Sequence, residues 1–364
     1  MRILFLNQYF PPDPAPTGVL LHELGEYLQS KGHTVEFISA RQDYRSTKKN
    51  RRRIFRELSA LGSIFFQGFK TQRPDIIFSA SSPPCLLVVA TLLAMRHGAK
   101  SVHWLMDMYP ELAVALGEIK EGFIPWAIKT LMGWAYRRAK LVVGLDDDMA
   151  ARLKEYGVTA EIIPPWVLKP LIASSPITGA ESEPDWTWIY SGNLGRAHEW
   201  ESLLQVQALL EERRLPYRLL FQGGGPSWPL AQARAKELNL RSCDWKPYVA
   251  EAGLQSSLLR CLVLVVTQRP ETQGLLWPSK LALVSTLPRA ILWIGPVDGA
   301  IARKLRQLPH TGVFAPFQAV LIADWLQALH SNEGSFQPPV CDDATRQREQ
   351  LLEKWDRLLN DLNK

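Results

Sequence analysis

The first 38 residues, MRILFLNQYFPPDPAPTGVLLHELGEYLQSKGHTVEFI (Met1–Ile38), predict a strand, a helix and a second strand in succession. Ile3–Leu6 and Val35–Ile38 are short runs rich in β-branched and aromatic residues, which is typical of buried strands. The apolar residues between these runs recur with helical spacing, at Leu20, Leu24, Tyr27 and Leu28. Two strands joined by a helix in this way form one unit of a parallel sheet.

The same strand pattern recurs along the rest of the chain. In the first half it lies at Ile76–Ser79, Val102–Asp107, Leu141–Leu145 and Glu161–Ile163. In the second half it lies at Thr187–Ser191, Arg218–Gln222, Leu262–Thr267 and Ala290–Gly295. Helix-length segments separate these runs, so the sequence predicts an α/β fold with two doubly wound parallel sheets.

The segment PPWVLKPLIASSPITGAESEPD (164–185) separates the two series of strands. It is rich in Pro, Ser and Gly and has no periodicity, which predicts a linker. A length of 364 residues is also typical of two domains. We expect an N-terminal domain over residues 1–168, a linker over 169–185, a C-terminal domain over 186–340 and a final helix within 341–364. Ligands of such domains bind beyond the carboxyl ends of the strands, here in a central cleft.

The composition is that of a soluble globular protein, with 46% hydrophobic and 21% charged residues. No apolar run is long enough to span a membrane. The opening stretch MRILFLNQYF has neither a basic n-region nor a cleavage site, so we do not expect secretion. The four cysteines are far apart in the sequence, so they form neither a zinc motif nor a redox motif. Few cysteines in a long chain suit a reducing cytosol, and we expect a cytoplasmic protein.

The net charge of +6 has a local origin. Seven basic residues without an acid between them lie at Arg45, Lys48, Lys49, Arg51, Arg52, Arg53 and Arg56. A local patch favours phospholipid or a phosphorylated ligand over nucleic acid. Segments 45–73 and 119–140 combine basic and aromatic residues with an apolar face, as interfacial helices do. The alternative is that both are ordinary helices packed on the sheet. The first reading predicts that Arg51, Arg52, Arg53 and Arg56 contact the inner face of the cytoplasmic membrane.

Three loops are candidates for phosphate or metal binding. Asn7–Gly18 ends in Gly18, where a helix N-terminus could receive phosphate, or it is a surface connection. The triplet Gly223–Gly225 lacks the G-x-G-x-x-G spacing, which disfavours a nicotinamide enzyme and favours a tight turn near the ligand that includes Gly224. Asp146–Asp148 could hold a cation, but its place between a strand and an apolar helix favours an N-cap, and we expect no metal.

The segment SVHWLMDMYPELAVALG (101–117) places His103 and Asp107 two alternations apart on one expected strand. Asp107 lies near its carboxyl end, where a carboxylate faces the cleft or caps the helix expected near Pro110. We expect His103 to be a hydrogen-bonded histidine of the core.

Two loops of the second half carry cations beside glycines. In YSGNLGRAHE (190–199), the residues that suit binding of a diphosphate are Ser191, Asn193, Gly195, Arg196 and His198. In RPETQGLLWPSK (269–280), Glu271 is an acceptor for hydroxyl groups, and the residues expected near phosphate are Gly274, Ser279 and Lys280.

These motifs resemble the family-4 retaining glycosyltransferases of the GT-B fold, in the bacterial branch that builds surface polysaccharides and glycolipids. The resemblance covers nearly the whole chain: NQYFPP, MDMYPE, LDDDM, YSGNLGRAHE and G-x-x-x-P-S-K occur in the family's order. It implies two Rossmann-like domains, with a nucleotide-sugar donor held mostly by the second and the acceptor mostly by the first. It also implies a final helix that crosses back to the first domain and no obligatory metal.

Carried over to this sequence, the resemblance implies that Arg196 and Lys280 bind the donor diphosphate. Glu271 looks like the first of two family glutamates, near the donor sugar. The second glutamate is missing, because Ser279 or Leu283 stands where it is expected.

The resulting expectation is a retaining hexosyltransferase that takes a sugar from a nucleotide donor, with UDP favoured, to a lipid-linked or polysaccharide acceptor. Cations and helix N-termini would oppose the charge of the departing diphosphate. The leaving phosphate would accept the acceptor's proton in a same-face attack, and Asp107 would position the acceptor. The alternatives are a nucleotide-sugar epimerase and a catalytically weak binding partner with the same fold.

Overall fold

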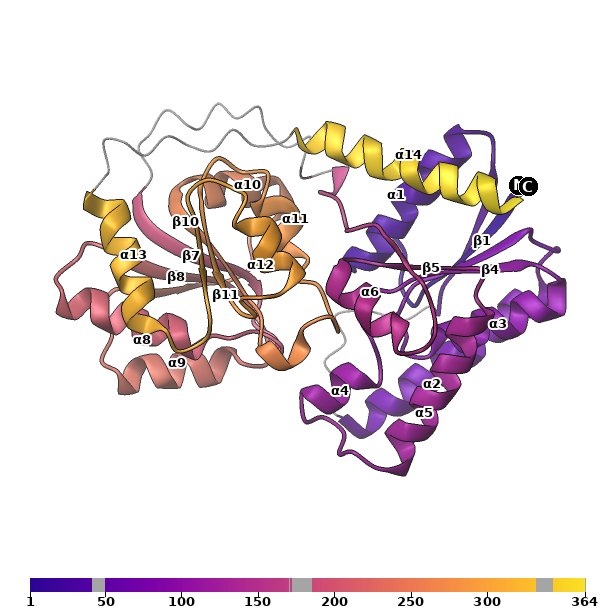
Figure 1. Cartoon of the computed structure of the whole chain (residues 1–364), viewed down its shortest axis with the longest axis horizontal. Helices are drawn as coiled ribbons and strands as arrows, with labels where there is room; N and C mark the ends of the chain where they lie inside the picture. Colours follow the sequence, from indigo (N-terminus) through magenta and orange to yellow (C-terminus); the bar gives the residue numbers. More distant parts are fainter. Residues whose placement is uncertain (41–49, 170, 172–184, 332–342, 364) are drawn as a thin grey trace. The chain divides into compact units, whose positions relative to one another are not determined.

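The computed structural model describes residues 1–40, 50–169, 171, 185–331 and 343–363 (Figure 1). The chain forms two compact units. Unit 1 comprises residues 1–166, 274–277 and 347–364, and unit 2 comprises residues 167–273 and 278–346. The expected linker, 169–185, lies almost entirely outside the described residues. Within the described residues, no helix is long and apolar enough to cross a membrane.

Unit 1 is built on a parallel six-stranded sheet with the order β2-β1-β3-β4-β5-β6. Its strands are β1 Arg2–Leu6, β2 Thr34–Ile38, β3 Ile76–Ser79, β4 Lys100–Trp104, β5 Leu141–Gly144 and β6 Glu161–Ile162. Its helices are α1 Pro16–Ser30, α2 Asn50–Lys70, α3 Leu86–His97, α4 Glu111–Ala115, α5 Phe123–Arg138, α6 Asp147–Lys154 and α14 Ala344–Asn363. The central strands are buried on both faces, as expected for a sheet covered by helices.

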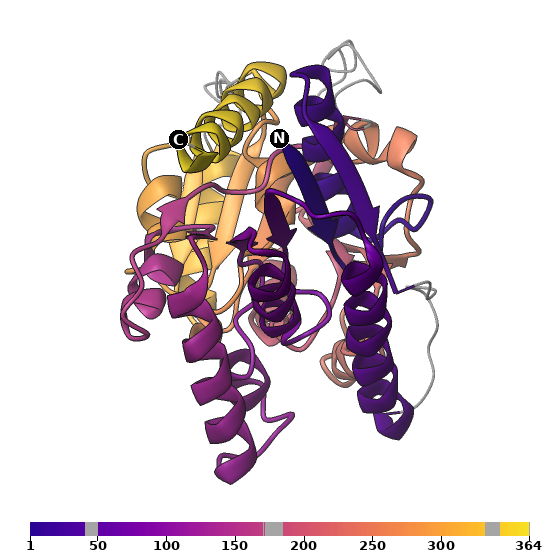
Figure 2. The ribbon, with the colours of Figure 1, turned by 90° about the vertical axis from the view of Figure 1, so that its right-hand side faces the viewer.

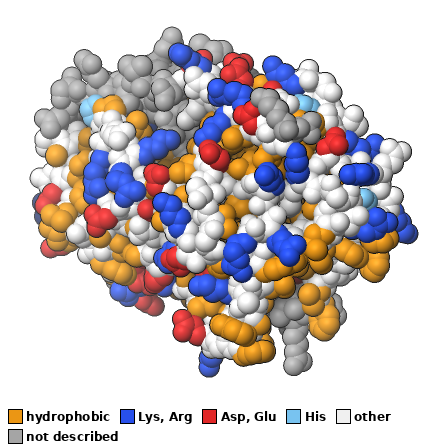
Figure 3. Space-filling view, turned by 45° about the vertical axis from the view of Figure 1, so that its right-hand side comes forward, with side chains coloured by type: hydrophobic (Ala, Val, Ile, Leu, Met, Phe, Trp, Pro, Cys, Tyr) orange, Lys and Arg blue, Asp and Glu red, His pale blue; other side chains and the backbone are white. Residues whose placement is uncertain are grey.

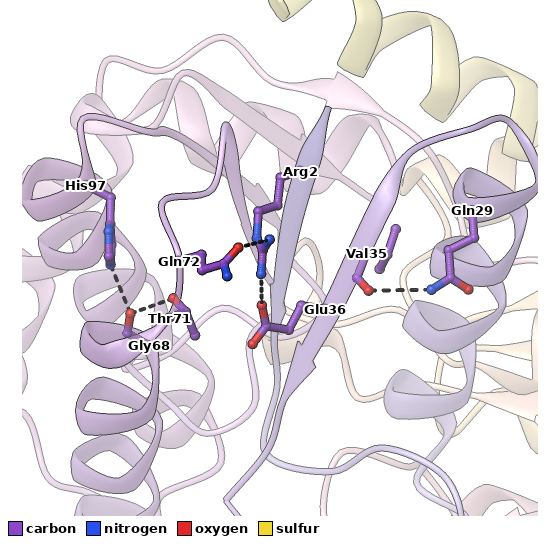
Figure 4. A network of polar contacts seen from close by, with 8 residues as sticks. All are labelled: Arg2, Gln29, Val35, Glu36, Gly68, Thr71, Gln72 and His97. Carbon is purple, nitrogen blue, oxygen red and sulfur yellow. Dashed lines mark hydrogen bonds and ion pairs between the residues drawn. The ribbon is translucent and has the colours of Figure 1, made fainter.

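Polar side chains hold the amino-terminal edge of this sheet together (Figure 4). The guanidinium of Arg2 donates hydrogen bonds to Glu36 of β2 at 2.9 Å and to Gln72 at 2.7 Å. Nearby, the carbonyl oxygen of Gly68 accepts from Thr71 and lies 2.9 Å from Nε2 of His97. These contacts join β1, β2, α2 and α3 at the edge opposite the carboxyl ends of the strands.

Helix α14 packs on unit 1, although it lies at the far end of the sequence (Figures 1 and 2). Its Trp355 is fully buried, with ring centroids 5.0 Å from Phe78 and 5.1 Å from Trp104. Arg348 donates from Nε to the buried carboxylate of Glu23 at 3.0 Å. A large aromatic contact and a buried ion pair therefore join the last helix to the first sheet.

Unit 2 is built on a second parallel sheet with the order β12-β11-β10-β7-β8-β9. Its strands are β7 Asp185–Asn193, β8 Arg218–Gly224, β9 Cys243–Lys246, β10 Cys261–Thr267, β11 Ala290–Ile294 and β12 Thr311–Phe314. Its helices are α8 Glu201–Glu212, α9 Trp228–Glu237, α10 Glu251–Leu259, the short 3-10 helix η1 Pro270–Thr272, α11 Lys280–Val284, α12 Ala300–Leu305 and α13 Ala319–Ser331. The expected α/β class with two doubly wound sheets is confirmed.

The strand order of unit 2 fixes where a ligand can bind. The chain direction across the sheet reverses between β7 and β10, because β8 and β9 continue on one side while β11 and β12 continue on the other. At such a switch point the loops after the two central strands diverge and leave a crevice at their carboxyl ends. The residues after β7 and β10 are therefore the candidates for ligand contact.

Candidate active site

Backbone hydrogen bonds gather the loops at the switch point of unit 2. The amide of Arg269, after β10, donates to the carbonyl of Ala197, after β7, at 2.8 Å. The ring nitrogen Nδ1 of His198 lies 2.9 Å from the carbonyl oxygen of Thr267, the last residue of β10. These bonds fix the YSGNLGRAHE loop next to the RPETQG loop.

The glycines at the ends of β7 and β8 allow these two strand ends to pack closely. A Cβ on Gly223 would lie 2.1 Å from the carbonyl oxygen of Gly192, and a Cβ on Gly225 would lie 2.4 Å from Oδ1 of Asn193. Both glycines also have a positive φ, 140° and 128°. Close packing and backbone conformation thus explain the triplet, and Gly224 lies between them beside the ring of Tyr248.

Lys280 is the most unusual side chain of this region. Its Nζ lies 3.3 Å from the centroid of the Tyr190 ring, and it has no hydrogen-bond partner among the described residues. An ideal Cβ on Gly192 would be 3.6 Å from Nζ, so this glycine borders the amine. Lys280 and Gly192 come together although they are 88 positions apart in the sequence.

Burial controls the charge of this group of side chains. It lowers the pKa of Lys280 well below the usual value for lysine. Burial, together with the positive charge of Lys280, lowers the pKa of His198 to about 3, so the imidazole is neutral at neutral pH. The hydroxyl of Thr267 is also buried without a partner among the described residues. An anion bound here would supply the partner that the amine lacks.

Arg196 lies at the tip of a turn in the same loop. The amide of His198 donates to the carbonyl of Gly195 at 3.2 Å, which closes a turn with Arg196 at its second position. The Arg196 side chain is exposed. Before this turn in the sequence, the hydroxyl of Ser191 accepts from Gln222, and Asn193 is exposed at the end of β7. The loop therefore presents a cation at the carboxyl end of the sheet.

The second loop presents Glu271 and Ser279. Glu271 is exposed in η1, and its carboxylate accepts from Arg269 at 2.8 Å. This hydrogen bond lowers the pKa of Glu271, which keeps the carboxylate ionised and able to accept from a hydroxyl group. Ser279 is exposed at the start of α11, and Leu283, the other position where a glutamate was expected, is buried.

Asp107 belongs to unit 1 and lies beyond the strand on which the sequence placed it. Strand β4 ends at Trp104, so His103 and Asp107 do not alternate along one strand. Asp107 instead forms an isolated antiparallel bridge with Leu276. Nor is it the N-cap of α4, where Pro110 stands. Burial raises the pKa of the Asp107 carboxyl to about 6.

His103 is buried, as expected, but only half of its ring is hydrogen-bonded. Nδ1 lies 2.9 Å from the hydroxyl of Ser79, whereas Nε2 has no partner among the described residues. Burial lowers its pKa to about 3. His103, Asp107 and Cys85 line a cavity of about 10 Å³, enough space for one water molecule. The expected core position of His103 is confirmed, and one of its two ring nitrogens has a hydrogen-bond partner among the described residues.

Two glycines assigned to the donor site from the sequence have packing roles in unit 1. Gly18 does not precede α1 but lies in its first turn, where a Cβ would be 2.4 Å from the carbonyl oxygen of Tyr9. Gly274 has φ 71°, and a Cβ there would be 2.9 Å from the carbonyl oxygen of Asp148. Close backbone contact is sufficient to explain both.

The aspartate triplet caps a helix, as the sequence predicts. The carboxylate of Asp146 accepts from the amide of Met149 at 2.8 Å at the start of α6. Within the part of the chain that the structure describes, no cluster of His, Cys, Asp and Glu could hold a metal ion.

The helices with basic and aromatic residues differ from one another in what they expose. In α2, Ile64 is buried and Phe65 packs on the core, while Phe55 and Phe66 are exposed at 75% and 67%. In α5, Tyr136 is buried, while Phe123, Ile124 and Trp126 near the start of the helix and Leu131 in its middle are exposed. Part of each expected apolar face is therefore buried in the core, and part is exposed at the surface.

The basic residues expected at the membrane are only partly described. The side chains of Arg51, Arg52 and Arg53 lie outside the described residues, and that of Arg56 is 3.5 Å from Glu57.

The exposed apolar residues belong to helices that project together from unit 1 (Figure 2). Figure 2 shows α2, α3 and α5 side by side below the sheet. Figure 3 shows hydrophobic side chains, with lysines and arginines among them, on the lower part of the face in view. On α3, Leu92 and Met95 are also exposed, and the guanidinium of Arg96 lies over the Phe69 ring.

Sequence reasoning missed two aromatic residues of the site in unit 2. In the sequence, Tyr190 has the pattern of an ordinary core residue of a strand. The structure shows that the Lys280 amine lies over its ring. Tyr248 follows β9, a short edge strand that the sequence pattern did not indicate, and its ring is 61% exposed beside Gly224. The only available signal for Tyr248 was an aromatic residue in a polar stretch.

Comparison with known proteins supports the expected family. Residues 17–167 match the sequence model of Glycosyltransferase Family 4. "Probable glycosyltransferase WbjE" of Pseudomonas aeruginosa is 25% identical over 332 residues, which are 83% of this chain and 82% of that protein.

Solved structures support the fold. Sucrose-phosphate synthase of Thermosynechococcus elongatus has a TM-score of 0.74 and 12% identity, with 100% of this chain and 99% of that one covered. HepE of Anabaena in complex with UDP has a TM-score of 0.64 and 13% identity, with 99% and 100% covered. The family match, the curated relative and these folds together confirm the resemblance to family 4 and identify the chain as a glycosyltransferase of the GT-B type.

Proposed function

We propose that the protein is a retaining hexosyltransferase that takes its sugar from a nucleoside diphosphate donor, with UDP favoured. The observation that carries this proposal is the Lys280 amine, which is buried without a partner among the described residues, at the switch point of the second sheet. A buried amine in such a place favours an anionic ligand. The similar fold of HepE, which was solved with UDP, supports the choice of nucleotide.

Breaking the bond between the anomeric carbon and the phosphate leaves negative charge on the diphosphate. Arg196 and Lys280 would oppose this charge once the donor is bound, and one group that stabilises the developing charge contributes about 3–4 kcal/mol to a transition state. In a same-face attack the departing phosphate oxygen accepts the proton of the acceptor hydroxyl, so no protein nucleophile is needed. Glu271 would accept hydrogen bonds from the donor sugar, and His198, being neutral, would add no charge.

Residues of both units have roles in this proposal. Asp107 would position the acceptor hydroxyl by accepting a hydrogen bond in its ionised form. Because burial raises its pKa to about 6, that form dominates at neutral pH. Ser191, Asn193, Gly195 and Ser279 border the donor in the proposal, and no step requires a metal.

We propose a lipid-linked or polysaccharide acceptor at an anionic membrane surface, reached from the cytoplasm. The exposed aromatic residues of α2 and α5, next to lysines and arginines, support this part of the proposal. Each basic residue near an anionic surface contributes about 1 kcal/mol to docking.

A binding protein with little catalysis is the second candidate. The observation that favours it is the absence of a glutamate at both Ser279 and Leu283. A panel of nucleotide sugars distinguishes the two candidates. Slow release of nucleoside diphosphate from one donor supports the transferase, whereas saturable binding without any release supports the binding protein.

A further inference from the structure

The amine of Lys280 rests against an aromatic ring and not against a polar group. Nζ is 3.3 Å from the Tyr190 centroid and is inaccessible to solvent, with no hydrogen-bond partner among the described residues. An ammonium group loses its hydration when it is buried, and a ring face compensates only partly for that loss. The environment therefore disfavours the charged form of this lysine.

The Tyr190 ring under the amine is held in place by a hydrogen bond and by two neighbouring rings. The Tyr190 hydroxyl donates to the carbonyl oxygen of Asn193 at 2.9 Å, and the ring packs against His198 at 5.7 Å and Phe221 at 5.9 Å. Gly192 has no side chain that would occupy the space beside Nζ. The ring is thus a rigid surface with room for one amine.

The groups that face the amine carry no negative charge. His198 is neutral at neutral pH, and burial raises the pKa of Tyr190 well above its usual value, so its phenol stays protonated. Tyr248, the other phenol nearby, also raises the pKa of Tyr190 through the negative charge of its ionised form. Glu271 is engaged by Arg269. Burial is accordingly the cause of the low Lys280 pKa, with no carboxylate among the described residues to oppose it.

We propose that the Tyr190 ring is the resting place of the Lys280 amine in the donor-free enzyme, and that a nucleoside diphosphate draws the amine onto its phosphate oxygens with uptake of one proton from solvent. This inference rests on the proposed function, because it takes the diphosphate as the ligand of Lys280. It adds a positioning role for Tyr190 and a dependence of donor binding on pH. Affinity should fall as the pH rises, because binding must then charge an amine that is neutral in the free enzyme.

The first test uses the ligand-free full chain labelled with ¹³C-lysine. The Lys280 Cε signal is assigned by its loss in Lys280→Met and followed from pH 6 to pH 11. We expect a titration midpoint well below the usual value for lysine, because burial lowers the pKa of Lys280. A midpoint at the usual value for lysine would overturn the proposed resting place, whether or not any nucleotide binds.

The second test measures proton uptake when UDP binds. Calorimetric titrations are run in two buffers of different ionisation enthalpy, at pH 8 or at the Lys280 midpoint found in the first test, whichever is higher, where the phosphates of UDP are fully ionised. The difference in binding enthalpy gives the number of protons taken up, which we expect to be between one half and one. Binding with no uptake would overturn the inference and leave the proposed function intact. Failure of every nucleoside diphosphate to bind would instead contradict the proposed function.

Two variants separate the ring from its hydroxyl. Tyr190→Phe keeps the ring face and loses the hydrogen bond to Asn193, so we expect uptake close to that of the wild type. Tyr190→Leu removes the ring, which lets the amine reach solvent and take its proton before UDP binds. We expect its uptake to fall by at least half. Equal uptake in the Phe and Leu variants would show that the ring has no part in holding the amine.

Discussion

Asp107 and Leu276 form an antiparallel backbone bridge within unit 1, although they are far apart in the sequence. The next residue, Met108, donates from its amide to the carbonyl of Leu275 at 2.8 Å. The bridge fixes the backbone at Asp107 just beyond β4. Its carboxylate is consequently held in a buried position, which raises its pKa to about 6.

The first prediction concerns stability and pH in Asp107→Asn. A raised pKa means that the folded protein holds the Asp107 proton more tightly than the unfolded chain does, so wild-type stability falls as the pH rises from 4 through 6. Asparagine has no proton to lose. We expect the Asn variant to gain about 2 kcal/mol relative to the wild type between pH 4 and pH 8.

Urea unfolding at the two pH values measures this difference. The same substitution should lower turnover at pH 7.5 and remove the loss of rate below pH 6. If the difference in stability between the variant and the wild type did not change with pH, the carboxylate of Asp107 would not be buried as described. If the rate of the variant still fell below pH 6, Asp107 would not position the acceptor.

The second prediction concerns the N-cap of α6. Asp146→Ala removes the acceptor of the Met149 amide and should cost about 1 kcal/mol. Asp146→Asn is the control, because asparagine also caps helices. Equal destabilisation of the two variants, measured by urea unfolding, would argue against capping as the role of Asp146.

The third prediction concerns α14. Trp355→Ala leaves a cavity between Phe78 and Trp104 and should destabilise unit 1 by about 3–5 kcal/mol. Hydrogen exchange by mass spectrometry is the suitable measurement, because two units need not unfold together. Amides of β3 and β4 should lose protection, and those of β7 and β10 are the internal reference. Unchanged exchange in β3 and β4 would refute the structural role of Trp355.

The fourth prediction concerns the membrane surface. Replacing Phe123 and Trp126 by serine should reduce flotation with vesicles of anionic phospholipid at least tenfold, since each buried aromatic side chain contributes about 1.5–3 kcal/mol. Leu230→Ser, an exposed apolar residue of unit 2, is the matched control. Neutralising Arg51, Arg52 and Arg53 should weaken binding to anionic but not to neutral vesicles. If none of these changes affected flotation, the surface formed by the exposed residues of α2 and α5 would be excluded as the membrane-docking face.

The sequence predicts the fold well because buried parallel strands are continuous apolar runs, such as Leu262–Thr267. It misses β9 and β12 because both are short edge strands, and β9 carries Asp244 and Lys246 among its four residues. For the candidate site, the sequence identifies the loops that carry the site residues, but it does not show why particular residues, such as the glycines, stand at their positions. Gly18, Gly225 and Gly274 are explained by contacts with distant backbone, which a single sequence does not reveal.

The central claim is that Arg196 and Lys280 bind the diphosphate of the donor, and UDP binding by calorimetry tests it most directly. Arg196→Ala and Lys280→Met should each weaken binding about tenfold to a hundredfold, because each removes a hydrogen bond between charged groups. Arg234→Ala and Lys236→Met on α9 are the matched controls and should bind UDP as the wild type does. Wild-type affinity in both the Arg196 and the Lys280 variants would contradict the account.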